Sequence, residues 1–115
     1  MKTEIRGRTR MTSEQLDLVA ERFRVLSEPA RLQLLQALMA GERSVGELVE
    51  LTGLSQANVS KHLQLLLAQD LVARRKEGVF AYYHLADQSV FQLCELVCSH
   101  LETSTRERQR RLARG

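Results

Sequence analysis

The stretch that most constrains the fold is residues 44–83, because its capping signals and apolar spacing fit one order of elements. Ser44 can cap a helix while Glu47 bonds back to the N–H of the cap residue. Thr52-Gly53-Leu54 breaks that helix, and Ser55 can cap a second one. Both helices carry apolar residues at helical spacing: Val45, Leu48, Val49 and Leu51 in the first, and Val59, Leu63, Leu66 and Leu67 in the second. The stretch therefore predicts two short helices joined by a tight turn.

The polar residues of the second helix have an unusual composition. Between Ser55 and Gln69 there is one lysine and no carboxylate, whereas a solvated helix normally mixes Glu and Lys. In the major groove of DNA, amides can pair with adenine edges, lysine can bind guanine or phosphate, and an acid would be repelled. We therefore expect this helix to read DNA. The expected contact residues are Ser55, Gln56, Ala57, Asn58, Ser60, Lys61 and Gln64.

A basic β-hairpin is predicted directly after the second helix. Residues 72–76 run into the turn signal Glu77-Gly78, and the chain returns through residues 80–85. Three consecutive cations are expected at its tip: Arg74, Arg75 and Lys76. Basic residues also mark edge strands that resist aggregation. Directly after a helix-turn-helix, however, they favour a wing that contacts phosphate, so the sequence predicts a winged helix-turn-helix.

Two helices are predicted before this unit and one after it. Thr12 or Ser13 can cap the first, Ser27-Glu28-Pro29 begins the second, Gly41 can end it, and Asp87 can cap the last. Their apolar positions recur at helical spacing: Leu16, Val19, Ala20, Phe23 and Leu26; then Ala30, Leu34, Leu35, Leu38 and Met39; then Val90, Phe91, Leu93, Cys94, Leu96, Val97, Cys98 and Leu101. The expected fold is mainly α with one small hairpin.

The apolar arc of the last helix is wider than one stripe. A terminal helix that covers only its own domain should have a polar opposite side, so the wide arc indicates a partner subunit. A two-fold dimer would place two reading helices about 34 Å apart and would match a palindromic operator. We therefore expect a homodimer that binds double-stranded DNA.

Charge is distributed unevenly along the 115 residues, whose formal net charge is +3. Residues 1–11 hold four cations and one acid, and residues 106–115 hold five arginines and one acid. Residues 55–85 hold four cations and two acids inside an otherwise acidic body, which is the local positive field of a nucleic-acid face. We expect a basic arm (1–11), one domain (12–103) and a basic tail (104–115). The two basic ends either touch phosphate or only aid solubility.

Other function classes receive little support from the sequence. No apolar run approaches the roughly 20 residues that span a bilayer, and the N-terminus lacks the apolar core of a secretion signal, so a cytoplasmic location is expected. There is no G-x-S-x-G elbow, phosphate-cradling Gly-rich loop or H-E-x-x-H motif, which argues against an enzyme. The alternative is a winged-helix protein-interaction module, or a constitutive regulator without an inducer site.

With this order of elements, the chain resembles the ArsR family of small bacterial winged-helix repressors over about residues 12–103. The matching stretches are LSEPARLQLLQAL at 26–38, SVGELVELTGLSQANVSKHLQLLLAQDLV at 44–72 and RRKEGVFAYYHL at 74–85. The resemblance implies a homodimer, built on the first and last helices, that represses a promoter and leaves it when an inducer binds.

The sensing sites of that family match this sequence poorly. The arsenic and lead type has cysteines in the first helix of the helix-turn-helix, where this chain has Val45, Gly46, Leu48 and Val49. Of the zinc-type ligand positions, Asp87 and His100 fit, but Ser89 and Thr103 occupy the other two, and zinc needs a complete tetrahedron. Persulfide sensors have a cysteine in the second helix, and residues 28–40 contain none.

Cys94 and Cys98 are the remaining sensing candidates, because they share one face of the last helix. Their Cβ atoms should lie about 6 Å apart, too far for an unstrained disulfide within one helix. Across a dimer axis the thiols of two chains can meet, or they can bind a thiophilic ion with His100 nearby. Cysteine also packs as a small hydrophobe, so sensing and core filling both remain open, and no cofactor is certain. His62, beside Lys61, can touch phosphate or pack at the helix base.

Overall fold

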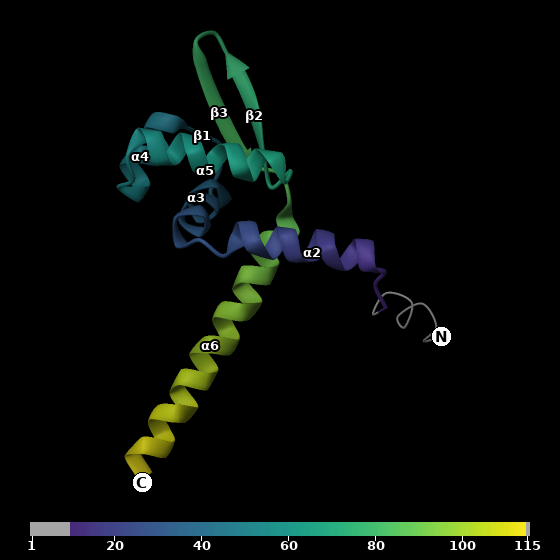
Figure 1. The fold of residues 1–115 in the computed structure, drawn as a ribbon. Helices are drawn as coiled ribbons and strands as arrows, with labels where there is room; N and C mark the ends of the chain where they lie inside the picture. Colours follow the sequence, from purple (N-terminus) through teal and green to yellow (C-terminus); the bar gives the residue numbers. More distant parts are fainter. Residues whose placement is uncertain (1–9, 115) are drawn as a thin grey trace.

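The computed structural model describes residues 10–114 and confirms the predicted winged helix-turn-helix. In this part of the chain the elements are α2 (Ser13–Leu26), α3 (Pro29–Met39), β1 (Arg43–Ser44), α4 (Val45–Thr52), α5 (Gln56–Ala68), β2 (Val72–Glu77), β3 (Phe80–Leu85) and α6 (Gln88–Arg114). Figure 1 shows the β2–β3 hairpin projecting from one end of the molecule, while α6 extends away from the other. The expected basic arm 1–11 lies almost wholly outside the described residues.

The predicted capping residues begin the helices. Thr12 and Gln15 form a reciprocal capping box at α2, and Ser44 and Glu47 form another at α4. The Ser55 hydroxyl accepts a bond of 3.1 Å from the backbone N–H of Asn58 at the start of α5. These bonds satisfy N–H groups that have no partner inside the helix, which explains why short local motifs fix the helix starts.

The hairpin belongs to a three-stranded antiparallel sheet with the order β1-β3-β2. Strand β1 pairs Arg43 with Tyr83 and was not predicted, because two residues carry no periodic signal. It joins the wing to the connection between α3 and α4. The two-residue turn at the tip begins with Gly78, whose φ of 63° is readily adopted by glycine.

The core lies between α3, α4, α5 and the base of the hairpin. Its fully covered side chains, each at most 2% exposed, are Val25, Leu34, Leu38, Leu48, Val59, Leu63, Leu66, Leu71 and Val72. Apart from Val25, which the sequence did not place on the inner face of its helix, these residues are the apolar positions that helical spacing assigned to the inside, together with Leu71 and Val72 at the entry to β2. The core therefore holds α5 by one side and leaves its opposite side exposed.

Several side chains that were expected to be buried are exposed in the single chain. The prediction of a buried face on α2 is wrong for four of its five residues: Leu16 and Phe23 are 51% and 53% exposed, and Val19 and Ala20 are exposed as well. In the single chain only the C-terminal end of α2, at Val25 and Leu26, is buried. Leu51 at the end of α4 is also exposed. On α6 the exposed apolar residues include Leu96, Val97 and Leu101. Helix α6 also continues through residues 104–114, beyond the predicted domain boundary.

Candidate nucleic-acid interface

The predicted DNA-contact residues of α5 and of its cap are all exposed to solvent. The exposed positions are Ser55, Gln56, Ala57, Asn58, Ser60, Lys61 and Gln64. Val59, Leu63 and Leu66 are fully buried on the opposite side of the helix. At 100° per residue, five of the exposed residues lie within one arc of about 140°: Gln56, Ala57, Ser60, Lys61 and Gln64. Asn58 lies at the margin of this arc, and Ser55 is the cap residue just before the helix. We call this set the reading face; it is polar and free of carboxylates.

Strand alternation divides the three cations of the wing between its two faces. Arg74 is paired with Tyr83 and Lys76 with Ala81, so both lie on the face whose base is buried in the core. Arg75 is paired with Tyr82 and lies on the opposite face. The sequence grouped these cations together, but the structure separates Arg75 from the other two.

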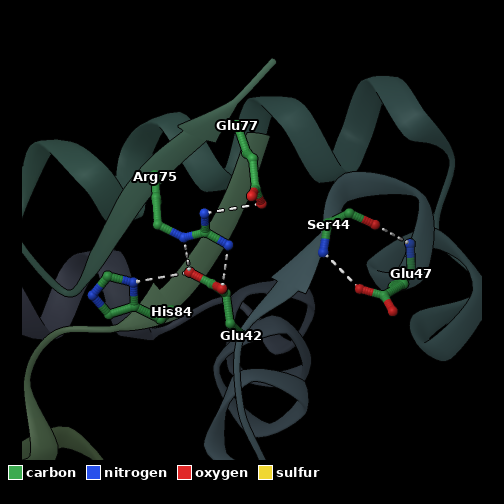
Figure 2. Close-up of polar contacts among 6 residues, drawn as sticks. All are labelled: Glu42, Ser44, Glu47, Arg75, Glu77 and His84. Carbon is green, nitrogen blue, oxygen red and sulfur yellow. Dashed lines mark hydrogen bonds and ion pairs between the residues drawn. The ribbon is translucent and has the colours of Figure 1, made fainter. Parts of the chain in front are cut away.

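Arg75 is held by acidic side chains, as Figure 2 shows. Its Nε and Nη2 donate to the two carboxylate oxygens of Glu42 at 3.0 and 2.8 Å, and its Nη1 donates to Glu77 at 3.1 Å. The guanidinium also lies 5.0 Å from the centre of the Tyr82 ring. These bonds hold the pKa of Glu42 below its ordinary value and raise that of Arg75. Arg75 therefore braces the wing against the segment just before β1.

Sequence reasoning missed Glu42 as part of this site. It lies 33 residues before Arg75, so no local spacing connects the two. His84 on β3 adds a weaker neighbour, with its Nδ1 3.9 Å from a Glu42 oxygen. The same close-up shows the Ser44–Glu47 capping box that starts α4 close to this network.

A buried polar contact supports α5 from below. His62 is only 8% exposed, and its Nδ1 accepts a bond of 3.2 Å from Nε of Arg31 on α3. Arg31 is buried as well and donates from Nη1 to the carbonyl of Val25. Burial is the main reason that the pKa of His62 is lowered, and the charges of Arg31 and Lys61 add to it. Of the two interpretations of His62, the structure supports packing at the helix base.

Cys94 and Cys98 both line an apolar pocket between α3 and α6, with a volume of about 400 Å³. Cys94 is half-buried and Cys98 is exposed. His100 follows Cys98 by two residues, which places it about 200° around the helix, away from both thiols. Among the described residues no group of three or more His, Cys, Asp or Glu side chains could hold a metal ion. One chain thus does not bring His100 together with the thiols.

Asp87, the other residue that resembles a zinc ligand, is engaged in protein contacts. Its Oδ1 accepts bonds from the backbone N–H and the hydroxyl of Ser89 at the start of α6. Its Oδ2 accepts a bond of 2.8 Å from Arg22, which also donates to the carbonyl of Gln69 after α5. The bonds from Ser89, followed by those from Arg22, lower the pKa of Asp87. This carboxylate caps α6, as predicted, and joins it to α2.

A helix-turn-helix with an acid-free reading face beside a basic hairpin defines a winged helix-turn-helix DNA-binding domain. Comparisons with known proteins agree with this class. The family model "Bacterial regulatory protein, arsR family" matches residues 28–74. A transcriptional repressor SmtB homologue of Synechocystis is 38% identical over 94 residues, which cover 82% of this chain and 71% of that protein. A probable mercury resistance operon repressor of Streptomyces lividans is 41% identical over 80 residues, covering 70% and 64%.

Solved structures give the same result. The crystal structure of Rv0081 from M. tuberculosis has a TM-score of 0.75 and 32% identity, covering 84% of this chain and 98% of the other. The homodimeric winged helix-turn-helix domain of Mb0332 from Mycobacterium bovis has a TM-score of 0.71 and 34% identity, covering 81% and 93%. The chain therefore belongs to the ArsR family and is a DNA-binding transcriptional repressor. This family consists of transcriptional regulators, not enzymes.

The structure also bears on membrane association. No helix within residues 10–114 is both long enough and apolar enough to cross a membrane.

Proposed function

We propose that a homodimer of this chain represses transcription by binding a palindromic operator, with α5 of each subunit in the major groove. The reading face carries this proposal, because its polar, acid-free residues lie opposite the side of α5 that the core holds. Gln56, Lys61 and Gln64 are the longest side chains on that face and are the proposed base-reading groups. Ser55 and Ser60 are suited to phosphate or backbone contacts.

The wing is proposed to contribute affinity rather than sequence preference. Arg74 and Lys76 form no hydrogen bond or ion pair with another described residue, so both charges are available for phosphate. Arg75 is already paired with Glu42 and Glu77. We therefore assign phosphate contact chiefly to Arg74 and Lys76, and give Arg75 the role of a brace that keeps the wing in position.

The dimer is proposed to form through α2 and α6, the helices that leave apolar side chains uncovered. Leu16 and Phe23 on α2, and Val97 and Leu101 on α6, are each 48% exposed or more. Burying such side chains is favourable by roughly 1.5–3 kcal/mol each when the burial is complete. The homodimeric Mycobacterium bovis domain supports a homodimer, and the uncovered apolar side chains support the choice of α2 and α6.

The proposal is tested by titrating labelled DNA from the region upstream of the gene and measuring fluorescence anisotropy. Gln56→Ala should relax the preference at one operator position by about 1 to 3 kcal/mol. Arg74→Ala should weaken binding to all DNA alike and lower the salt slope by about one. Gln92→Ala, an exposed glutamine on α6, is the matched control and should bind as wild type does. Binding that is unaffected by salt would instead favour the protein-interaction module.

A response to thiol chemistry is a second proposed function. It is favoured by one observation: Cys94 and Cys98 line the same apolar pocket between α3 and α6. A modified thiol or a bound thiophilic ion would occupy part of this pocket and add polar or charged atoms to the apolar contact between α3 and the proposed dimer helix α6. The DNA titration of wild type and a Cys94→Ser, Cys98→Ser variant should then differ under oxidant, polysulfide, Zn²⁺ or arsenite. Identical responses would mean that the thiols only fill space.

A further inference from the structure

The tip of the wing carries apolar side chains where a hairpin turn usually has polar ones. Val79, the second residue of the turn, is 90% exposed, the highest value among the large hydrophobic side chains that the structure describes. Gly78 before it has no side chain, and Phe80 after it begins β3. The end of the hairpin is therefore narrow and is formed mainly by one apolar side chain.

Dimer formation cannot account for this exposure. Many of the other exposed large hydrophobic residues lie on α2 and α6, the two helices assigned to the dimer interface. In Figure 1 the hairpin tip and the C-terminal end of α6 lie at opposite ends of the molecule. A second copy packed on α2 and α6 would therefore leave Val79 exposed. We therefore look for a partner of Val79 other than a second copy of the chain.

We propose that Val79 enters the minor groove beside the site read by α5 and makes the repressor prefer A·T pairs there. This inference rests on the proposed function, because it requires the reading face to lie in the major groove. Six-residue strands at about 3.3 Å per residue give the wing a reach of about 20 Å. The neighbouring minor groove is about half a DNA turn away, or roughly 17 Å. The tip is thus long enough to arrive there.

Charge and shape both fit the minor groove. It is about 6 Å wide and lies between two phosphate backbones, so a tip with one side chain can enter it. Lys76 lies one residue pair behind the last pair of the hairpin, and Arg74 lies three pairs behind it. Neither side chain forms an ion pair with another described residue, so both charges can face the phosphates that flank the groove. Phe80 is paired with Glu77, on the same face as Arg75. We therefore assign the groove contact to Val79 and not to Phe80.

The side chain of Val79 explains the expected base preference. In the minor groove a G·C pair adds the N2 amino donor of guanine, whereas A·T and T·A pairs show only acceptors. A valine cannot accept a hydrogen bond, so it would displace water from that amino group and leave the donor unpaired. Apolar side chains are known to contact and wedge the minor groove. The methyl groups of Val79 therefore predict that the repressor binds less tightly where a G·C pair lies at this position.

The test replaces the flanking pair, located by footprinting, with A·T, G·C or inosine·C, and measures the affinity of the full chain for each. Inosine lacks the 2-amino group but keeps the major-groove pattern of guanine, so it isolates the minor groove. Wild type should bind the A·T and inosine·C sites equally and both about tenfold more tightly than the G·C site. The isosteric Val79→Thr variant, whose hydroxyl can accept a hydrogen bond, should lose most of this discrimination.

Two controls separate the possible failures. Gln92→Ala changes an exposed glutamine on the polar side of α6, and should discriminate as wild type does. Gln56→Ala should lose preference at its own position while keeping the flanking preference. Either of two results would refute the proposed minor-groove contact of Val79. The inosine·C site would bind as weakly as the G·C site, or Val79→Thr would discriminate as wild type does. If the Val79 contact is refuted but Gln56→Ala still loses preference at its own position, the proposed function stands. If Gln56→Ala leaves every base preference unchanged, the proposed function and the Val79 contact both fail.

Discussion

The reading half of the molecule, from α3 to β3, closes its own core, whereas the outer helices α2 and α6 do not. Most of the buried hydrophobic residues lie in the reading half, while α2 contributes only Val25 and Leu26 and α6 only Val90. Along α2 and α6 the side chains of Phe23 and Leu101 are more than half exposed. This difference indicates that one chain is enough to close the core behind α5, whereas the apolar side chains of the outer helices would be covered in the proposed dimer.

Arg22 connects the two regions. It extends from α2, donates to Asp87 at the start of α6, and donates to the carbonyl of Gln69 just after α5. A movement of α2 and α6 against a partner subunit would therefore pull on the end of the reading helix. In the proposed dimer this contact would connect the interface helices to the end of α5.

The largest expected effect comes from the closed core. Leu63→Ala removes a fully buried side chain from the inner side of α5 and should lower the free energy of unfolding by about 2–5 kcal/mol. Because this core lies within one chain, the loss should be similar at low and high protein concentration. Urea unfolding measures it, with Val79→Ala as the exposed control, which should change stability by less than about 0.5 kcal/mol. A comparable loss in both variants would contradict the assignment of the core.

The next largest effect is expected on α6, one of the two outer helices whose apolar side chains the proposed dimer would cover. Val97→Glu should separate the dimer while the single chain stays folded, because Val97 is 48% exposed when no partner covers it. Burying an unpaired carboxylate at an interface should cost about 3 kcal/mol, or roughly a hundredfold in the dimer dissociation constant. Sedimentation gives the mass and circular dichroism the helix content. Gln92→Glu adds the same charge on the polar side of α6 and should stay dimeric; a monomeric wild type at micromolar concentration would contradict the prediction.

The difference between the two regions also shows what sequence alone can predict. Helix starts at Thr12, Ser44 and Ser55 were predictable because capping bonds span three residues. The outward face of α5 followed from helical spacing. The exposure of Phe23 did not, because spacing identifies an apolar face but not whether the same chain covers it. The pairing of Arg75 with Glu42 joins distant parts of the chain through the fold and has no local signal.

A smaller effect is expected where the two regions meet. Arg22→Ala removes the ion pair with Asp87 and the bond to the Gln69 carbonyl, and should lower the free energy of unfolding by about 1 kcal/mol. The Arg22 and Asp87 side chains are 38% and 27% exposed, so solvent screens the pair and the expected value is modest. A double-mutant cycle with Asp87→Asn isolates the coupling. Strictly additive losses would mean that Arg22 does not join α2 to α6 through this carboxylate.

The smallest expected effect is a pH dependence that belongs to the reading half. In the folded chain the pKa of His62 is lowered, because burial and the nearby charges of Arg31 and Lys61 disfavour the charged imidazole. As pH falls below about 6.5, the unfolded chain binds a proton that the folded chain resists, so stability should decrease. The decrease from pH 7.5 to 5.5 should be at most about 1 kcal/mol.

The matched variants for this prediction are His62→Gln and His84→Gln. Glutamine at position 62 can still accept the bond from Arg31 but cannot titrate, so its unfolding free energy should vary less with pH than that of wild type. His84 is exposed on β3, away from the contact beneath α5, so His84→Gln is the control for replacing a histidine elsewhere in the fold. The lowered pKa values of Asp87 and Glu42 place their titration below this window. An equal slope in wild type and His62→Gln would show that the contact beneath α5 does not resist protonation.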